Sequence, residues 1–285
     1  MSNGFLLQLS SPLQSWGEHS AFTDRDTTAY PTRSGLIGML ASAQGISRAQ
    51  AVEGPPDSPP TAFASLRALH FTIRVDRPGT RLRDYHTVGG GYPASRTLPT
   101  AKGGRRKVEA ATLVTHRHYL ADAFFTVAVT AGPTAPENLL TTCTNALRHP
   151  HWPLHLGRRS CPPGPSLLLR ADCTDPVAEL SNVPLARKPP PGTPPSGDTS
   201  VTFVSDAPFP ADDTWGPTSS AITTTLNDEP VRLTARDRIH HTRTLYTGHR
   251  MLPAHLCNGY GADYLDALHN YLHPAAPDAP DGTRP

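Results

Sequence analysis

The chain has 285 residues, a formal net charge of +2, 32 prolines and four cysteines. A net charge this small provides no global electrostatic field, so a nucleic-acid ligand would have to be held by local clusters of Lys and Arg. No apolar run approaches the length of a membrane span and no signal peptide is recognisable, so we expect a cytoplasmic protein without a membrane partner.

The cysteines and histidines do not form a metal-binding pattern. No two of the four cysteines form a CxxC pair, which argues against a zinc knuckle and against a disulfide framework. The histidines of the segment from His149 to His155 lie in a run that proline interrupts, with no carboxylate beside them. We therefore expect no metal and no cofactor.

The first part of the chain predicts a strand followed by a helix. Apolar and polar residues alternate over residues 5–9, which is typical of a strand. Apolar residues at helical spacing follow Ser34, and Gly45 supplies a stop. The free amides at the start of this helix, together with Arg33, would suit a phosphate, although simple capping by Thr32 or Ser34 explains the same residues.

The next elements give the order on which the fold prediction depends. The pattern predicts a short helix at 61–66, strands at 68–75 and 123–131, a helix at 136–148, and strand material at 154–156 and 167–169. This order is that of the ferredoxin-like (RRM-like) βαββαβ fold of the α+β class. Its second and third strands are adjacent and antiparallel, so the segment between them would project as a long hairpin.

The organisation predicted from these elements has one core and one extension. Residues 1–175 would form the ferredoxin-like core, with the protruding hairpin, or thumb, at about 81–119. Residues 176–272, with strands at 201–204 and 239–246, would form a β-rich extension packed on the core, because their apolar residues are too few for a second core. A proline-rich linker is expected at about 186–198 and a disordered tail at 273–285.

The segment 81–119 combines three features of a site for single-stranded nucleic acid. Glycines at 89–91 free the backbone, cations gather at 102–107, and residues 116–119 provide rings that can stack on bases. Two further basic clusters lie at 158–159 and 232–250. A mobile, solvated surface loop explains the hairpin residues equally well, and charge runs are usually solvated faces.

Five words of the sequence, in order, resemble the CasD family, the "Cas five" subunit of the Cascade CRISPR surveillance complex. They lie at 13–17, 31–35, 83–91, 115–123 and 156–161, and read LQSWG, PTRSG, RDYHTVGGG, THRHYLADA and LGRRSC. The resemblance spans roughly residues 6–161, while the C-terminal half matches only loosely. It implies a protein of the RAMP superfamily with a ferredoxin-like core and a basic thumb.

The resemblance also implies a function and partners. Family members hold the 5′ handle of the CRISPR RNA against a backbone subunit of CasC type and a large subunit of CasA type, and would meet target DNA only indirectly. Trp16 and Tyr119 could stack on bases, although Trp16 also reads as a core aromatic. The candidate RNA-binding residues are Gln14, Trp16, Arg25, Arg33, Ser34, His86, Lys102, Arg105, Arg106, Lys107, His116, Arg117, Tyr119, Arg158 and Arg159.

Two other classes of function compete with this one. A metal-independent endoribonuclease would use His86, His116, His118 and Tyr119 as general base and acid. In the subtype that the words resemble, processing belongs to a different subunit, so we expect no catalytic residue. A protein-binding module would instead present the cluster at 232–250 to an acidic partner.

Overall fold

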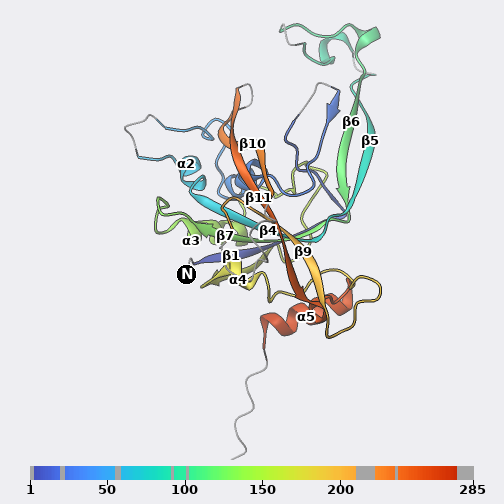
Figure 1. Ribbon diagram of the computed structural model, residues 1–285. Coiled ribbons are helices and arrows are strands. Elements are labelled where there is room, and N and C mark those ends of the chain that lie inside the picture. Colours follow the sequence, from blue (N-terminus) through green and yellow to red (C-terminus); the bar gives the residue numbers. More distant parts are fainter. Residues whose placement is uncertain are drawn as a thin grey trace, which may run out of the picture.

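A seven-stranded antiparallel sheet forms the centre of the molecule, with the strand order β10-β11-β9-β4-β7-β1-β8 (Figure 1). The computed structural model describes residues 3–19, 23–54, 59–90, 93–100, 103–209, 222–234 and 237–274. The strands are β1 (Gly4–Ser10), β4 (Leu69–Arg77), β7 (Phe124–Ala131), β8 (Leu168–Cys173), β9 (Asp198–Ser205), β10 (Ile222–Leu233) and β11 (Arg238–Pro253).

Helices cover both faces of this sheet, and alternate residues of the central strands supply both cores. Phe5 and Leu7 of β1 pack in one cluster with residues of α1 (Arg33–Ala43), α2 (Ala62–Leu66) and α3 (Leu139–Arg148). Leu6, which points the opposite way, packs in a second cluster with Tyr264 of α5 (Ala262–Leu272). The short helix α4 (Pro176–Glu179) also contacts β1 and β7. The central strands are therefore apolar on both sides.

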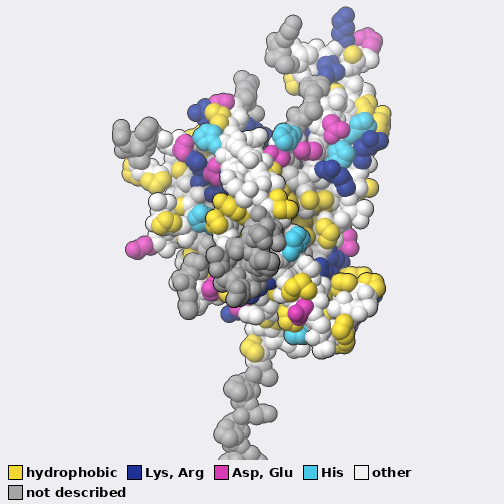
Figure 2. All heavy atoms as spheres, in the orientation of Figure 1, with side chains coloured by type: hydrophobic (Ala, Val, Ile, Leu, Met, Phe, Trp, Pro, Cys, Tyr) yellow, Lys and Arg dark blue, Asp and Glu magenta, His cyan; other side chains and the backbone are white. Residues whose placement is uncertain are grey.

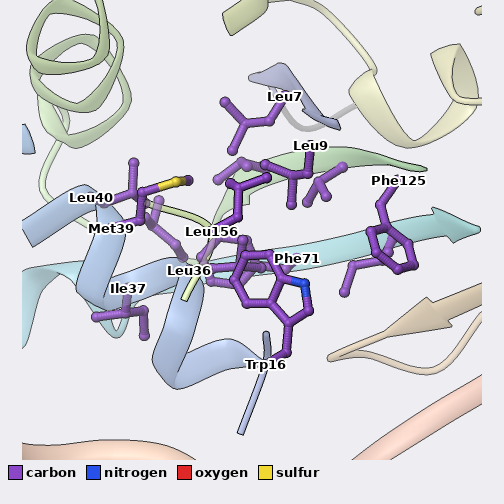
Figure 3. Packing of buried hydrophobic residues seen from close by; sticks show 14 of the residues in the cluster. Leu7, Leu9, Trp16, Leu36, Ile37, Met39, Leu40, Phe71, Phe125 and Leu156 are labelled. Carbon is purple, nitrogen blue, oxygen red and sulfur yellow. The ribbon is translucent and has the colours of Figure 1, made fainter. Parts of the chain in front are cut away.

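The first core cluster is built around Trp16, whose ring lies among leucines of β1 and α1 (Figure 3). Only 1% of this residue is exposed. Its indole Nε1 donates a hydrogen bond of 3.0 Å to Oε1 of Gln14. The amide of Gln14 in turn donates to the carbonyls of Leu9 (3.0 Å) and Ala123 (2.9 Å). This chain of bonds satisfies the polar atoms that accompany the ring into the core.

Most predicted elements of the first 175 residues are confirmed. The helix α1 follows Thr32 and ends before Gly45, which has a φ of 74°. The predicted adjacency of the second and third strands is also confirmed, because β4 and β7 pair in antiparallel register. The prediction of strand material at 154–156 is wrong. These residues form a loop, in which the carbonyl of Leu156 accepts a hydrogen bond from the amide of Ser15 and its amide donates one to the carbonyl of Cys161.

The C-terminal part adds strands to the same sheet, because β9 pairs with β4. The pattern did not predict β10 or α5. The proline-rich residues 188–195 contain no helix or strand. From residue 275 onward, the predicted tail lies outside the described residues.

A hairpin arm projects from the end of the β4/β7 pair (Figure 1). We use "the arm" for β5 (Thr80–Val88), β6 (Leu113–Ala121) and the residues between them. Gly79 (φ 73°) and Asp122 (φ 57°) change the chain direction where the sheet gives way to the arm. Glycine is required at position 79, because a Cβ there would lie 2.7 Å from the carbonyl oxygen of Ala121.

Two short strands attach the base of the arm to the body. They are β2 (Leu13–Gln14) and β3 (Asp24–Arg25), and both pair with β6. The guanidinium of Arg81 adds a hydrogen bond to the carbonyl of Thr27. The arm therefore begins as part of a second, four-stranded sheet and leaves the body only beyond β3.

Buried ion pairs tie the N-terminus of α1 to the C-terminal strands. The backbone amide of Arg33 donates to Oδ2 of Asp228, on β10, at 2.7 Å. The guanidinium of Arg33 pairs with Asp206 at 2.6 Å and with Glu229. Arg243 pairs with Asp206 at 2.8 Å and with Asp228 at 2.6 Å. Since Asp228 occupies the positive end of the helix, the phosphate site suggested there is wrong.

Replacing Asp228 with Ala should destabilise the protein severely, because the guanidinium of Arg243 loses one of its two carboxylate partners and the first amide of α1 loses its acceptor. We expect a loss of about 3–5 kcal/mol in the free energy of unfolding, measured in urea. Asp237→Ala is the matched control, because Asp237 pairs with Arg232 at the surface, and we expect it to cost less than about 1 kcal/mol. Equal losses for the two variants would contradict the assignment.

Candidate nucleic-acid interface

A groove runs beside α1 and encloses about 1040 Å³. Small residues of the helix line it, which leaves the space open, and we call it the α1 groove. These residues are Ser34, Gly35, Gly38, Ala41 and Ser42. The rest of the lining is rich in cations and includes the exposed ring of Trp152; the cations are Arg25, Arg48, Arg158, Arg159 and Arg238.

Arg158 joins the wall of this groove to the base of the arm. Its guanidinium donates hydrogen bonds to the carbonyls of His118 on β6 (2.7 Å) and Arg25 on β3 (2.9 Å). It also lies over the ring of Tyr119, 4.8 Å from the centroid. The preceding residue must be glycine, because a Cβ on Gly157 (φ 92°) would lie 1.7 Å from the carbonyl oxygen of Ser15. Arg158 and Tyr119 thus connect the groove to the arm, and the contact with the carbonyl of Arg25 fixes the position of that neighbouring cation.

Four of the groove arginines have no carboxylate partner among the described residues: Arg25, Arg48, Arg159 and Arg238. Burial and the guanidinium groups of Arg48 and Arg25 lower the pKa of Arg238. Burial and the neighbouring Arg238 likewise lower the pKa of His240, which lines the same groove. Both groups line the groove, and the cause of both shifts is partial desolvation beside like charges. An anion that entered the groove would relieve this repulsion.

The arm carries its polar side chains on two distinct faces, because residues opposite each other in a β pair share a face. Tyr85 lies opposite His116 and Arg83 opposite His118, which places these four on one face. The ring of Tyr85 is 65% exposed, and its centroid lies 5.9 Å from that of His116. Figure 2 shows Lys, Arg and His side chains along the arm, with Asp and Glu among them.

Three predicted RNA-binding residues are buried and cannot contact RNA from their positions. Gln14 and Trp16 lie in the core, and only 6% of Arg33 is exposed. Gln14 and Trp16 bond to each other, and Arg33 is used by the ion pairs at the start of α1. The prediction that these three residues contact RNA is therefore corrected to a structural role. For Trp16 this role is that of a core aromatic, the alternative given in the sequence analysis.

The other predicted residues fall into two groups. Arg25, Ser34, Arg158 and Arg159 line the α1 groove. The remaining described ones lie on the arm: His86 on β5, His116, Arg117 and Tyr119 on β6, and Arg105, Arg106 and Lys107 near the tip. Lys102 lies outside the described residues. Arg105 donates a hydrogen bond of 2.6 Å to the carbonyl of Thr97, and Tyr119 is nearly buried.

Sequence reasoning missed five residues that the structure places at these surfaces. Arg83 and Tyr85 belonged to a quoted motif, and period-two alternation along the arm would have identified their shared face. Trp152, which is 38% exposed, lines the groove, yet in the sequence it stands out only as part of a histidine-rich run. Arg238 belonged to the basic cluster at 232–250, but only the fold brings it, together with Arg48, to the groove.

The residues proposed for the endoribonuclease alternative do not converge. His86 lies on the opposite face of the arm from His116 and His118. His118 faces Asp24 at 3.2 Å, and His86 faces Asp84 at 3.5 Å. The hydroxyl of Tyr119, a largely buried residue, lies 3.4 Å from that of Ser160. The arm thus divides the proposed residues between its two faces, whereas a base and an acid must flank one scissile bond.

The described part of the chain offers neither a cluster of metal ligands nor a membrane-crossing helix. Its residues include no group of three or more His, Cys, Asp or Glu side chains placed to hold a metal ion. None of its helices has the length and apolar character needed to cross a membrane.

Comparisons with known proteins assign the family. The model of the family described as CRISPR-associated protein (Cas_Cas5) matches residues 4–244. The chain belongs to this family. Over 191 residues it is 34% identical to "CRISPR system Cascade subunit CasD" of Escherichia coli (strain K12), a match that covers 64% of this chain and 77% of that protein.

Solved structures support the same assignment. A chain of a structure described as "CRISPR RNA-guided surveillance complex" is 43% identical, with a TM-score of 0.77, over 94% of this Cas5 chain and 99% of that chain. Another, described as "Crystal structure of Cas protein", is 26% identical, with a TM-score of 0.52, over 91% of this chain and 98% of that one. The family resemblance of the five sequence words is thereby confirmed.

Because the α1 groove is open beside Gly38, replacing this glycine with alanine should stabilise the protein. A Cβ added to Gly38 would meet nothing within 4 Å, so Gly38→Ala should raise the free energy of unfolding by roughly 0.5–1 kcal/mol through helix propensity alone. Gly45→Ala is the control at the end of the same helix. It should destabilise, because φ is 74° and the Cβ would lie 2.8 Å from His151. Urea unfolding measures both; a destabilised Gly38→Ala variant would mean that the groove is filled.

Proposed function

We propose that this Cas5 chain is a non-catalytic subunit of a Cascade-type surveillance complex that holds the 5′ handle of the CRISPR RNA. Its neighbours would be a backbone subunit of CasC type and a large subunit of CasA type, and it would meet target DNA only indirectly. Membership of the family supports this role, as does the likeness to a Cascade subunit and to a chain of an RNA-guided complex.

The strand order supports a ferredoxin-like core within the larger sheet. In chain order, β1, β4, β7 and β8 are its first to fourth strands, and they lie side by side as second, third, first, fourth. All three pairings are antiparallel, and α1 and α3 pack on one face of these strands. This order supports a split βαββαβ unit, in which the arm would be the thumb inserted between the second and third strands.

The observation that carries the proposal is the continuity of the groove with the arm. Arg25 lines the α1 groove, and it lies on β3, which pairs with β6 at His116 and Arg117. A strand of RNA that leaves the groove past Arg25 would therefore reach the arm along β3, where the carboxylates that flank Arg25 face histidines: Asp24 faces His118 (3.2 Å) and Asp26 faces His19 (3.7 Å). Cations without carboxylate partners among the described residues lie at both ends of this path, Arg238 in the groove and Arg83 on the arm.

The chemistry of the path suits single-stranded RNA. Guanidinium groups hold phosphates in a planar, bidentate geometry, and these contacts fix the register of the strand. Exposed rings provide faces on which unstacked bases can lie, and such contacts are worth about 1–3 kcal/mol per base. Trp152 in the groove and Tyr85 on the arm are two described rings that suit this purpose.

The alternative function, binding of an acidic protein, has no continuous basic surface among the described residues of the cluster. It required the basic cluster between residues 232 and 250 to act as one patch. Arg232 pairs with Asp237, Arg243 is buried in the ion pairs below α1, and Arg250 donates to the hydroxyl of Ser181. Arg236 lies outside the described residues, so Arg238 is the described member that faces the groove.

Removing cations from the arm should weaken RNA binding in a salt-dependent way. For the double variant Arg83→Ala, Lys107→Ala, we expect lower affinity for RNA that carries the repeat-derived 5′ end. The slope of log K against log salt should fall by about 1 for each phosphate that the variant no longer neutralises. Filter binding over a salt series measures both quantities. Arg232→Ala serves as the control, and a slope equal to the control's would exclude the arm from the RNA path.

A holding role also predicts that precursor RNA survives contact with the protein. His116→Ala and the unmodified chain should both leave labelled precursor RNA at full length on a denaturing gel, because the histidines of the arm do not converge on one bond. Cleavage by the unmodified chain that disappears in His116→Ala would instead favour the endoribonuclease.

A further inference from the structure

We propose that Arg25, Arg48 and Arg238 together form a cradle for one backbone phosphate of the bound RNA, so that the C-terminal strands take part in holding the strand. This inference rests on the proposed function and deepens it. It assigns a role to β11, whose sequence matches the family words only loosely.

The three arginines come from parts of the chain that only the fold brings together. Arg25 lies on β3, Arg48 follows α1, and Arg238 begins β11. All three line the same groove, and all three are exposed. Partial desolvation, followed by the charges of Arg48 and Arg25, lowers the pKa of Arg238, as expected for cations that line one groove. Three cations without carboxylate partners in one place are unfavourable unless an anion joins them.

The acidic groups nearest to this cluster are already engaged, so the described part of the chain does not supply that anion itself. Asp228 and Glu229 pair with the arginines below α1. Asp26, the carboxylate that also lines the groove, accepts hydrogen bonds from the backbone amide of His19 and lies 3.7 Å from its imidazole, and Asp24 faces His118 at 3.2 Å. Other arginines of the chain contrast with the cluster, since Arg67 and Arg74 each face a carboxylate directly. The cradle is therefore built from cations that the fold leaves without internal partners of opposite charge.

The shape of the site favours a nucleic-acid strand over a free anion. The groove encloses about 1040 Å³, while a space of about 300–1,000 Å³ already accommodates a drug-sized molecule. A single phosphate would leave most of it empty. The groove also contains an exposed aromatic ring, Trp152, and a floor of Gly and Ser residues that allows a backbone to approach closely. A phosphate held by arginines beside a base stacked on a ring is how proteins bind single strands.

The test compares three single variants by filter binding with RNA that carries the repeat-derived 5′ end. Arg238→Ala and Arg48→Ala should each lower the affinity about tenfold or more, the usual cost of removing a charge-assisted hydrogen bond. The salt slope should fall by about 1 in each single variant. In the double variant the total fall should also be about 1, because both residues hold the same phosphate. The control, Arg232→Ala, removes the same charge from the same hairpin outside the groove and should change neither quantity.

A fourth variant tests the groove without altering its charge. Gly38→Leu places an isobutyl group in the open space and should also lower RNA affinity, while thermal unfolding shows whether the fold is retained. If Arg238→Ala and Arg48→Ala bind RNA as well as Arg232→Ala does, the cradle is overturned and the proposed function stands. If the unmodified chain does not prefer this RNA over unrelated RNA, the proposed function itself fails. If the two variants keep RNA affinity but lose a neighbouring subunit on co-purification, the groove holds an acidic protein segment instead.

Discussion

One buried carboxylate, that of Asp228, sets the relation between the two halves of this Cas5 chain. It accepts a hydrogen bond from the first amide of α1 and pairs with Arg243 of β11, so it fixes the helix against the C-terminal hairpin. A buried ion pair adds little net stability compared with apolar packing, but an unpartnered member is costly. The network therefore restricts how β10 and β11 can dock. The position of Arg238 relative to Arg25 and Arg48 follows from this restriction.

Arginines in this protein consequently have two separate tasks. Arg33, Arg74 and Arg243 are buried and use their donors on carboxylates and carbonyls, which hold distant segments together. Arg158 is an intermediate case, because it lines the groove while its donors bind backbone carbonyls of β3 and β6. Arg25, Arg48, Arg159 and Arg238, which have no carboxylate partner among the described residues, line the groove. A net charge of +2 is compatible with a local anion site because the internal pairs occupy many of the acidic groups.

Local patterns were sufficient for the first half of the fold and insufficient for the second. Periods of two and 3.6 residues identified β1, α1, β4, β7 and α3, because each buries one or both faces on the same core. The strand β10 gave no clear pattern because it is mostly polar and interrupted by bulges, with Asp228 inside it. The helix α5 does carry a signal, Tyr264 and Leu268 at helical spacing after Gly261. For the site, Arg33 was expected to point outward, but its partners Asp206 and Asp228 lie more than 170 residues away in the sequence.

The central claim is that one RNA strand passes from the α1 groove onto the arm. Ultraviolet crosslinking of the assembled complex with its RNA, followed by mass spectrometry of the crosslinked peptides, tests this claim most directly. The account predicts nucleotide adducts on peptides that contain Trp152 of the groove and Tyr85 of the arm, from neighbouring positions of the RNA. Adducts confined to peptides of α4 and α5, on the other face of the sheet, would contradict it.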